Sequence, residues 1–167
     1  MNRAPTGSAR ASLCAANLSQ VPNFICPSCG NRSVSTDRTA GFRDRPRGCQ
    51  RCGFGFLFEL LDDYYPAPNA AFVVLDQDAR VIGLGRGVRE LTGLGDSDAI
   101  GRPVREVFGL EFENGDDHIG TALEWGVRMM DKPVTVHAEG DRPEPAQADI
   151  FPAYDEDGGL LVVLTPK

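Results

Sequence analysis

AFVVLDQDARVIGLGRGVRELTG, residues 71–93, contains the pattern from which the fold of this chain can be worked out. An apolar run, 71–75, and a mostly apolar run that begins with Arg80, 80–84, are separated by a short polar turn, and this spacing predicts a β-hairpin. Residues 88–93 then predict a short helix that ends at Gly93, because glycine readily takes the left-handed conformation of a helix C-cap. The stretch therefore opens an antiparallel sheet and leads into helices.

Further helices and strands are predicted downstream. Asp96 can cap a turn through Ile100, and Asp116 or Asp117 can cap a longer helix. Apolar residues recur along this longer helix with a helical period, at Ile119, Ala122, Leu123, Gly126, Val127 and Met130. Alternating or continuous apolar runs then predict three more strands, over 132–138, 146–154 and 160–165. We expect an α+β fold with a five-stranded antiparallel sheet and helices on one face.

This order of elements resembles the PAS domain over residues 66–167. The opening hairpin, AFVVLD followed by RVI, is similar to that of the family. Residues 90–93 (ELTG) resemble its helix-ending segment, and residues 100–103 (IGRP) resemble its I-G-R segment. The resemblance implies a PAS-like sensory or regulatory domain over residues 70–167, with a small molecule or a protein partner as its input.

The resemblance also has departures. Gly85 stands where many PAS sequences have an asparagine, and no cysteine follows Cys52, which disfavours the photochemical branches that need a thiol. A noncovalent ligand between sheet and longer helix stays open. On a second face of that helix, the side chains that could line such a pocket are His118, Ala122, Trp125 and Met129. Only His118 and His137 could ligate a haem, and we favour the alternative that the face with His118 packs in the core or against a partner.

Four cysteines are the strongest chemical signal in the chain. They are arranged as CPSCG (26–30) and CQRCG (49–53), with nineteen residues between the pairs. Two such pairs suit tetrahedral Zn²⁺, and the glycine after each pair permits a tight turn. The pattern resembles a zinc ribbon, with Cys26, Cys29, Cys49 and Cys52 as ligands of a structural ion. The alternatives are disulfides, a redox-active dithiol and an iron centre.

Four arginines lie near the second cysteine pair, namely Arg43, Arg45, Arg47 and Arg51. They could contact an anion, a nucleic acid or an acidic protein. The alternative is a solvated loop, which we favour because no aromatic side chains for base stacking are interleaved with the arginines. Nucleic-acid binding is therefore considered but not favoured.

Composition divides the chain into modules. We expect a flexible arm over residues 1–22, a ribbon over 23–58, a connector over 59–69 and the PAS-like domain over 70–167. All five cysteines lie in residues 1–60, which carry eight arginines and three acidic residues, a charge of +5. The net charge of the whole chain is −7, so residues 61–167 have a net charge of −12, which repels nucleic acid.

These features predict a non-catalytic sensory or regulatory protein. No nucleophile with a base is evident, and residues 83–87 (GLGRG) lack the third glycine of a dinucleotide-binding loop. No apolar window is long enough for a membrane span, and we expect a cytoplasmic protein. The chain ends directly after the last expected strand, so a protein partner is expected to carry the output. The alternatives are a transcription-associated ribbon that contacts nucleic acid or polymerase, and a structural adaptor with an empty domain.

Two of the expected strands, 71–75 and 160–164, are apolar at every position, so both of their faces should be covered. Helices would cover one face. The other face would meet the aromatic connector, the ribbon or a second copy of the chain, and PAS domains resembling this one often form dimers through that surface. A homodimer through the outer sheet face is therefore expected.

Overall fold

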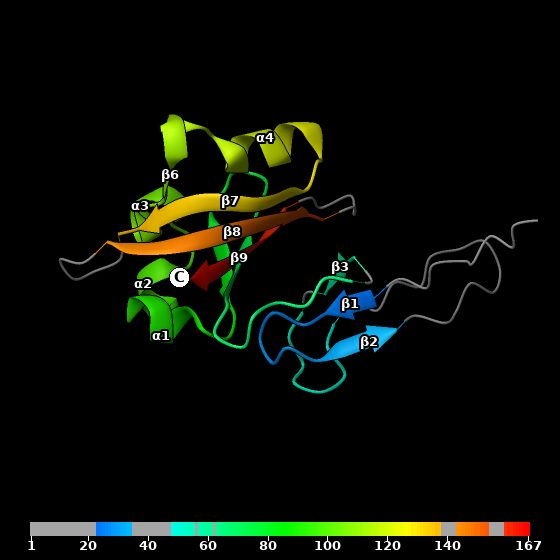
Figure 1. The fold of residues 1–167 in the computed structure, drawn as a ribbon. Helices are drawn as coiled ribbons and strands as arrows, with labels where there is room; N and C mark the ends of the chain where they lie inside the picture. The colour runs from blue at the N-terminus through cyan, green and yellow to red at the C-terminus, as the bar shows by residue number, and fades with distance from the viewer. Residues whose placement is uncertain (1–22, 35–47, 56, 62, 138–142, 154–158) are drawn as a thin grey trace, which may run out of the picture.

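The structure is a computed structural model that describes residues 23–34, 48–55, 57–61, 63–137, 143–153 and 159–167 (Figure 1). The described residues form a small three-stranded sheet and a six-stranded sheet, both antiparallel. The expected arm over residues 1–22 lies outside the described residues.

The small sheet contains the cysteine pairs. Its strands are β1 (Asn23–Ile25), β2 (Arg32–Val34) and β3 (Phe58–Leu60), in the order β2-β1-β3. The first cysteine pair forms the turn between β1 and β2, and the second pair precedes β3. We call the described parts of residues 23–60 the cysteine module. Strand β3 pairs with β1, and Phe56 lies outside the described residues.

The large sheet has six strands, which corrects the expected five. Its order is β5-β4-β9-β8-β7-β6, with bounds β4 (Ala71–Leu75), β5 (Val81–Leu84), β6 (Glu111–Phe112), β7 (Met129–Val136), β8 (Glu144–Pro152) and β9 (Leu160–Pro166). The additional strand is β6, in which Glu111 pairs with Thr135 and Phe112 with Val134. A strand of two residues is too short to show a sequence period, so only its pairing with β7 identifies it.

Short helices connect β5 to β7. They are α1 (Val88–Thr92), α2 (Asp96–Ala99), α3 (Val104–Phe108), the 3-10 helix η1 (Glu113–Gly115) and α4 (His118–Trp125). As predicted, Gly93 caps α1 with φ 75°. Asp117 caps α4, where its carboxylate accepts the Gly120 N–H at 2.7 Å. Among the described residues, no helix is long and apolar enough to cross a membrane.

Helix α4 is shorter than its apolar period suggested. The period continues to Met130, but the helix ends at Gly126, which has a φ of 60° and donates its N–H to Ala122. Met129 already belongs to β7. Glycine in the left-handed conformation therefore stops a helix that the apolar period alone would continue.

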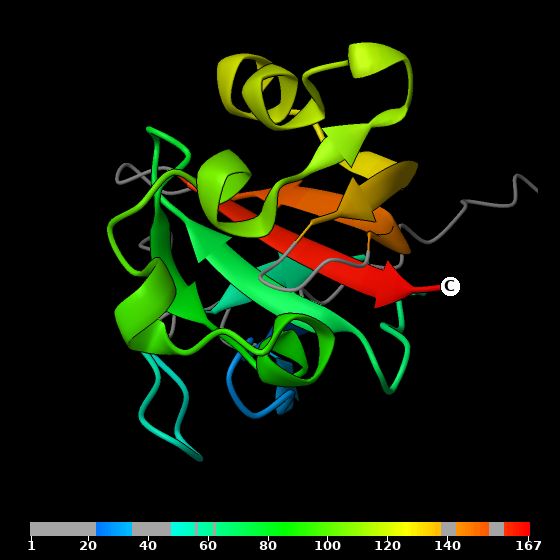
Figure 2. The same cartoon turned by 90° about the vertical axis from the view of Figure 1, so that its left-hand side faces the viewer.

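The helices cover the inner face of the large sheet, as expected. Figure 2 looks from the helical side, with the blue strands of the cysteine module behind the sheet. The main core joins β4, β8 and β9 to helix residues that include Val88, Phe108, Ile119 and Ala122, each at most 1% exposed. Burying side chains of this size stabilises the fold by about 1.5–3 kcal/mol each.

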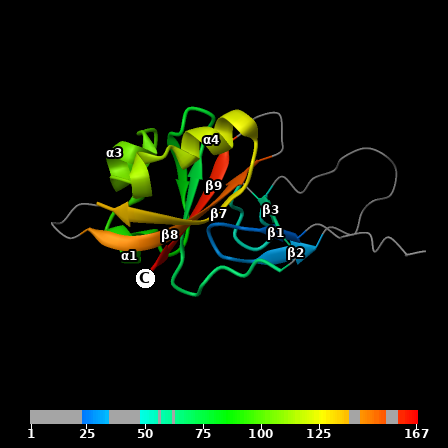
Figure 3. The same cartoon turned by 45° about the horizontal axis from the view of Figure 1, so that its top comes forward.

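The outer sheet face is buried as well. We define it by five side chains that are at most 1% exposed: Phe72, Val74, Phe151, Leu161 and Val163. Together with Ile25, Phe58 and Leu60 of the cysteine module they form a second core (Figure 3). The chain thus covers this face itself, and a homodimer through it, as expected from the sequence, would require the module to move aside.

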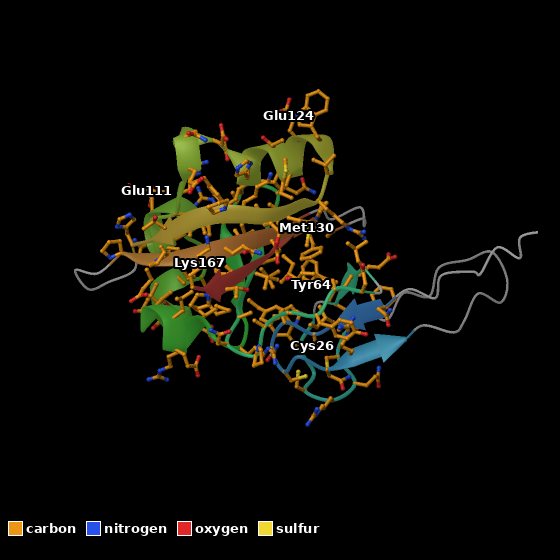
Figure 4. The ribbon with its side chains drawn as sticks, viewed as in Figure 1. Cys26, Tyr64, Glu111, Glu124, Met130 and Lys167 are labelled. Atoms are coloured by element: carbon orange, nitrogen blue, oxygen red, sulfur yellow. The ribbon has the colours of Figure 1, made fainter. Side chains whose placement is uncertain are left out.

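The connector is attached to the sheet by a buried hydrogen bond. The Tyr64 hydroxyl donates to Asp149 Oδ2 at 2.7 Å, and the Asp131 N–H donates to Asp149 Oδ1 at 2.8 Å. Figure 4 shows Tyr64 and Met130 on the side of the sheet that faces the module. Burial raises the pKa of the Tyr64 hydroxyl, and the neighbouring Asp149 raises it further, so the hydroxyl remains a donor. Tyr64 therefore attaches the connector to the sheet, whereas the neighbouring Tyr65 is exposed.

Replacing Tyr64 with phenylalanine should remove about 1–3 kcal/mol from the free energy of unfolding, because the buried Asp149 carboxylate loses one of its donors. Urea denaturation followed by circular dichroism measures the change. The matched control is Tyr65→Phe, since Tyr65 is 74% exposed and its substitution should leave stability unchanged. Equal stabilities of the two variants would contradict the role of this bond.

Candidate metal centre

The two cysteine pairs converge on one point of the cysteine module. The Sγ atoms of Cys26 and Cys52 lie 3.5 Å apart, those of Cys29 and Cys49 lie 3.6 Å apart, and all four lie within 4.8 Å of one another. Cys26 and Cys49 are buried, whereas Cys52 is exposed. The site thus lies at the surface of the module with two of its sulfurs turned inward.

Both cysteine pairs form the same turn. The Cys26 N–H donates to the Asn31 carbonyl, and the Cys49 N–H donates to the Phe54 carbonyl, five residues ahead in each case. The glycine after each pair donates its N–H back to the first cysteine, with φ 69° at Gly30 and 77° at Gly53. Such positive angles favour glycine, which explains why each pair is followed by one.

The thiols differ in their electrostatic surroundings. Burial raises the pKa of Cys26 to about 12, and burial also raises the pKa of Cys29. Backbone N–H donors of Cys52 and then Arg51 lower the pKa of Cys49 to about 6, and the Arg51 N–H lies 3.4 Å from the Cys49 Sγ. Four thiolates this close together need a central cation, because their mutual repulsion and burial oppose ionisation.

The sulfur spacing fits one metal ion. A tetrahedral Zn²⁺ with bonds of about 2.3 Å places its sulfurs roughly 3.8 Å apart, which the observed separations bracket. A disulfide needs about 2.05 Å between sulfurs, far less than either measured pair. Four sulfurs leave no position for a substrate, so an ion held here would stabilise structure.

The first cysteine turn is seated on the edge of the large sheet. The Arg86 N–H donates to the Pro27 carbonyl at 3.0 Å, and Pro27 lies between the first two cysteines. Gly85 makes this approach feasible, because a Cβ there would lie 2.2 Å from the Pro27 oxygen and 2.8 Å from the Phe72 Cβ. The Arg86 guanidinium lies over the Phe72 ring at 5.0 Å. Gly85, which departs from the family pattern, is thus the contact point between module and sheet.

This contact was not predicted from the sequence. The run GLGRG (83–87) was compared with a dinucleotide-binding loop, and Gly85 was noted only as a departure from the PAS pattern. A Cβ on Gly83 would lie 3.0 Å from Phe54 of the second cysteine turn, so Gly83 also admits the module. Glycines two positions apart in an extended segment leave one face of its backbone without side chains. Such a face indicates that another segment packs closely against the backbone.

The arginine cluster is only partly described. Arg43, Arg45 and Arg47 lie outside the described residues, and Arg51 is exposed on the second cysteine turn. Two other arginines contact the connector and the sheet. Arg32 donates a hydrogen bond to the Tyr64 carbonyl at 2.9 Å. The Arg86 N–H donates to the Pro27 carbonyl.

The four residues expected around a PAS ligand lie on α4 and β7. His118 stacks edge-on against Phe112 with ring centroids 5.1 Å apart. Trp125 is 70% exposed, and Met129 lies in β7. Ala122 alone among them lines a recess of about 480 Å³ between α4 and the ends of β8 and β9, together with residues that include Gln77, Leu123, Pro152 and Gly159.

Comparison with known proteins agrees with this fold. The model of a family described as PAS fold matches residues 66–165. The PAS domain of nitrogen regulation protein NR(II) from Vibrio parahaemolyticus superposes with a TM-score of 0.51 at 16% identity, covering 60% of this chain and 91% of that chain. A variant of Vivid superposes with a TM-score of 0.50 at 12% identity, covering 63% of this chain and 82% of that chain. Among curated proteins, no sequence matches this chain.

Replacing Gly85 with alanine should lower the free energy of unfolding by about 1–3 kcal/mol, because the new Cβ overlaps the Pro27 carbonyl and forces the cysteine turn away. Chemical denaturation of the metal-loaded protein measures this loss. Gly55→Ala is the matched control, since a Cβ there would meet nothing within 4 Å. A Gly85 variant as stable as the control would rule out the close seat.

Proposed function

Because the chain belongs to the PAS fold family over residues 66–165, we propose that it acts as a non-catalytic regulatory protein whose PAS domain receives a small molecule or a protein partner. A structural zinc ribbon supports this domain from its outer side. A protein partner carries the output. The proposal assigns no chemical step to any residue.

The metal in this proposal is Zn²⁺. Cys26, Cys29, Cys49 and Cys52 would hold it, and the ion would supply the positive charge that four adjacent thiolates need. Zinc suits the site because it prefers four thiolates in a tetrahedron and has no redox chemistry of its own. An iron centre of the same ligand set would be coloured, which separates the two metals by absorption spectroscopy.

The second core is the observation that supports the proposal most directly. Ile25 of the cysteine module is 1% exposed, and it packs in one cluster with Phe72 and Leu161 of the outer sheet face. The module is thus part of the same folded body as the PAS domain. A change on one side of this contact therefore affects the other, as a regulatory protein requires.

The input is best sought at two places. Phe108 and Ile150 of the inner core are both fully buried, so we place the input at the surface. For a partner protein, the exposed Trp125 at the end of α4 and Val127 just after the helix offer apolar contact area. For a small molecule, the recess beside Ala122 has a volume in the range of ligand sites.

Native mass spectrometry of the full chain, purified under reducing conditions, should find one Zn²⁺ per chain. Cys52→Ser should lose the ion and unfold at a temperature lower by several degrees or more, because metal binding contributes directly to folding. The matched control is Cys14→Ser, since Cys14 lies outside both cysteine pairs and its variant should retain the ion. A wild-type chain without metal would refute the zinc site, and an additional small-molecule mass would identify the input.

A further inference from the structure

We infer that the cysteine module is a metal-dependent cover of the outer sheet face, so that loading of the four-cysteine site controls whether this face is accessible. The inference rests on the metal site proposed above. It goes beyond that site because it links metal loading to the accessibility of side chains of the PAS domain, on the outer sheet face that the module covers.

The module has little structure to maintain it without the metal. Each of its strands has three residues, and a sheet of this size is marginally stable by itself. Three of its large apolar side chains, Ile25, Phe58 and Leu60, belong to the second core and pack with the large sheet. What closes the module internally is the pair of cysteine turns, which brings the four sulfurs within 4.8 Å.

The first cysteine turn carries both the ligands and the contact with the sheet. Pro27, between Cys26 and Cys29, accepts the Arg86 N–H at 3.0 Å. The Arg86 guanidinium also lies against the turn, since a Cβ built on Gly30 would come 2.9 Å from its Nη1. The Nε of this guanidinium is buried and has no hydrogen-bond partner among the described residues. Its position is thus maintained by packing between the turn and the Phe72 ring.

This arrangement links metal loss to exposure of the sheet. Without the ion, no bonds to a shared metal keep the four partly buried thiols together. The turn that contains Pro27 then relaxes. The seat on Gly85 then loses its partner, and Phe58 and Leu60 lose the sheet that positions them. Phe72 and Phe151, at most 1% exposed in the covered state, become accessible to solvent.

Hydroxyl-radical footprinting with mass spectrometry tests this on the full chain. Metal-loaded protein is compared with protein stripped by a chelator under reducing conditions, with the metal content of each sample measured. Labelling of Phe72 and Phe151 should rise several-fold on stripping and return to its starting level when Zn²⁺ is added back. Phe108 is the internal control, since it is fully buried on the inner face, away from the module, and its labelling should not change.

Three results would overturn the inference. Unchanged protection of Phe72 and Phe151 after verified metal loss would show that the module stays docked without the ion, and the zinc site itself would stand. An equal rise at Phe108 would show that the whole domain opens rather than its cover. A purified chain that holds no metal would overturn the proposed zinc site and this inference together, so the failures are distinguishable.

A variant of the cover separates docking from metal loading. Phe58→Asp places a charge in the second core but leaves all four cysteines unchanged. It should bind metal and yet show high labelling of Phe72 and Phe151 in the metal-loaded state, with Phe108 still protected. The matched control is Tyr65→Asp, because Tyr65 is 74% exposed and lies outside the second core. Full protection in Phe58→Asp would contradict the cover.

Discussion

The central strands of the large sheet are apolar on both faces, and this constraint determines how the rest of the molecule is arranged. Every side chain of β4 and the first five of β9 are buried. One face of a sheet cannot cover the other, so two separate layers are needed. The helices supply the inner layer and the cysteine module supplies the outer one. Both layers come from the same chain, which places the module in a fixed position on the PAS domain.

The outer layer is too small to be stable without further support. Its strands are short, and Ile25, Phe58 and Leu60 pack against the sheet in the second core. An ion held by the four cysteines would compensate for the small core of the module, in the way that metals and disulfides stabilise other small modules. The sheet supplies the apolar contacts of the module. The sheet in turn depends on the module for protection from water.

The contact between the layers depends on glycine and on backbone atoms. Gly83 and Gly85 leave room for Phe54 and for the Pro27 carbonyl, and the Arg86 N–H donates a hydrogen bond to the Pro27 carbonyl of the first cysteine turn. On the opposite end of the interface, Tyr64 connects the connector to Asp149 of β8. The interface thus has an apolar centre with a polar anchor at each side, an arrangement that fixes orientation as well as affinity.

The sequence by itself was enough to predict the PAS-like domain, the separate four-cysteine module and the four candidate metal ligands. It also predicted the hairpin of 71–84 and the helix cap at Gly93. These features depend on local periods, on turn chemistry and on fixed cysteine spacing, all of which act over a few residues. Only the tertiary structure determined the sixth strand, the end of α4 at Gly126 and the seat on Gly85. A two-residue strand has no period, and an apolar period continues through the glycine that ends a helix. Close approach of two backbones leaves no mark in the sequence except the absence of a side chain.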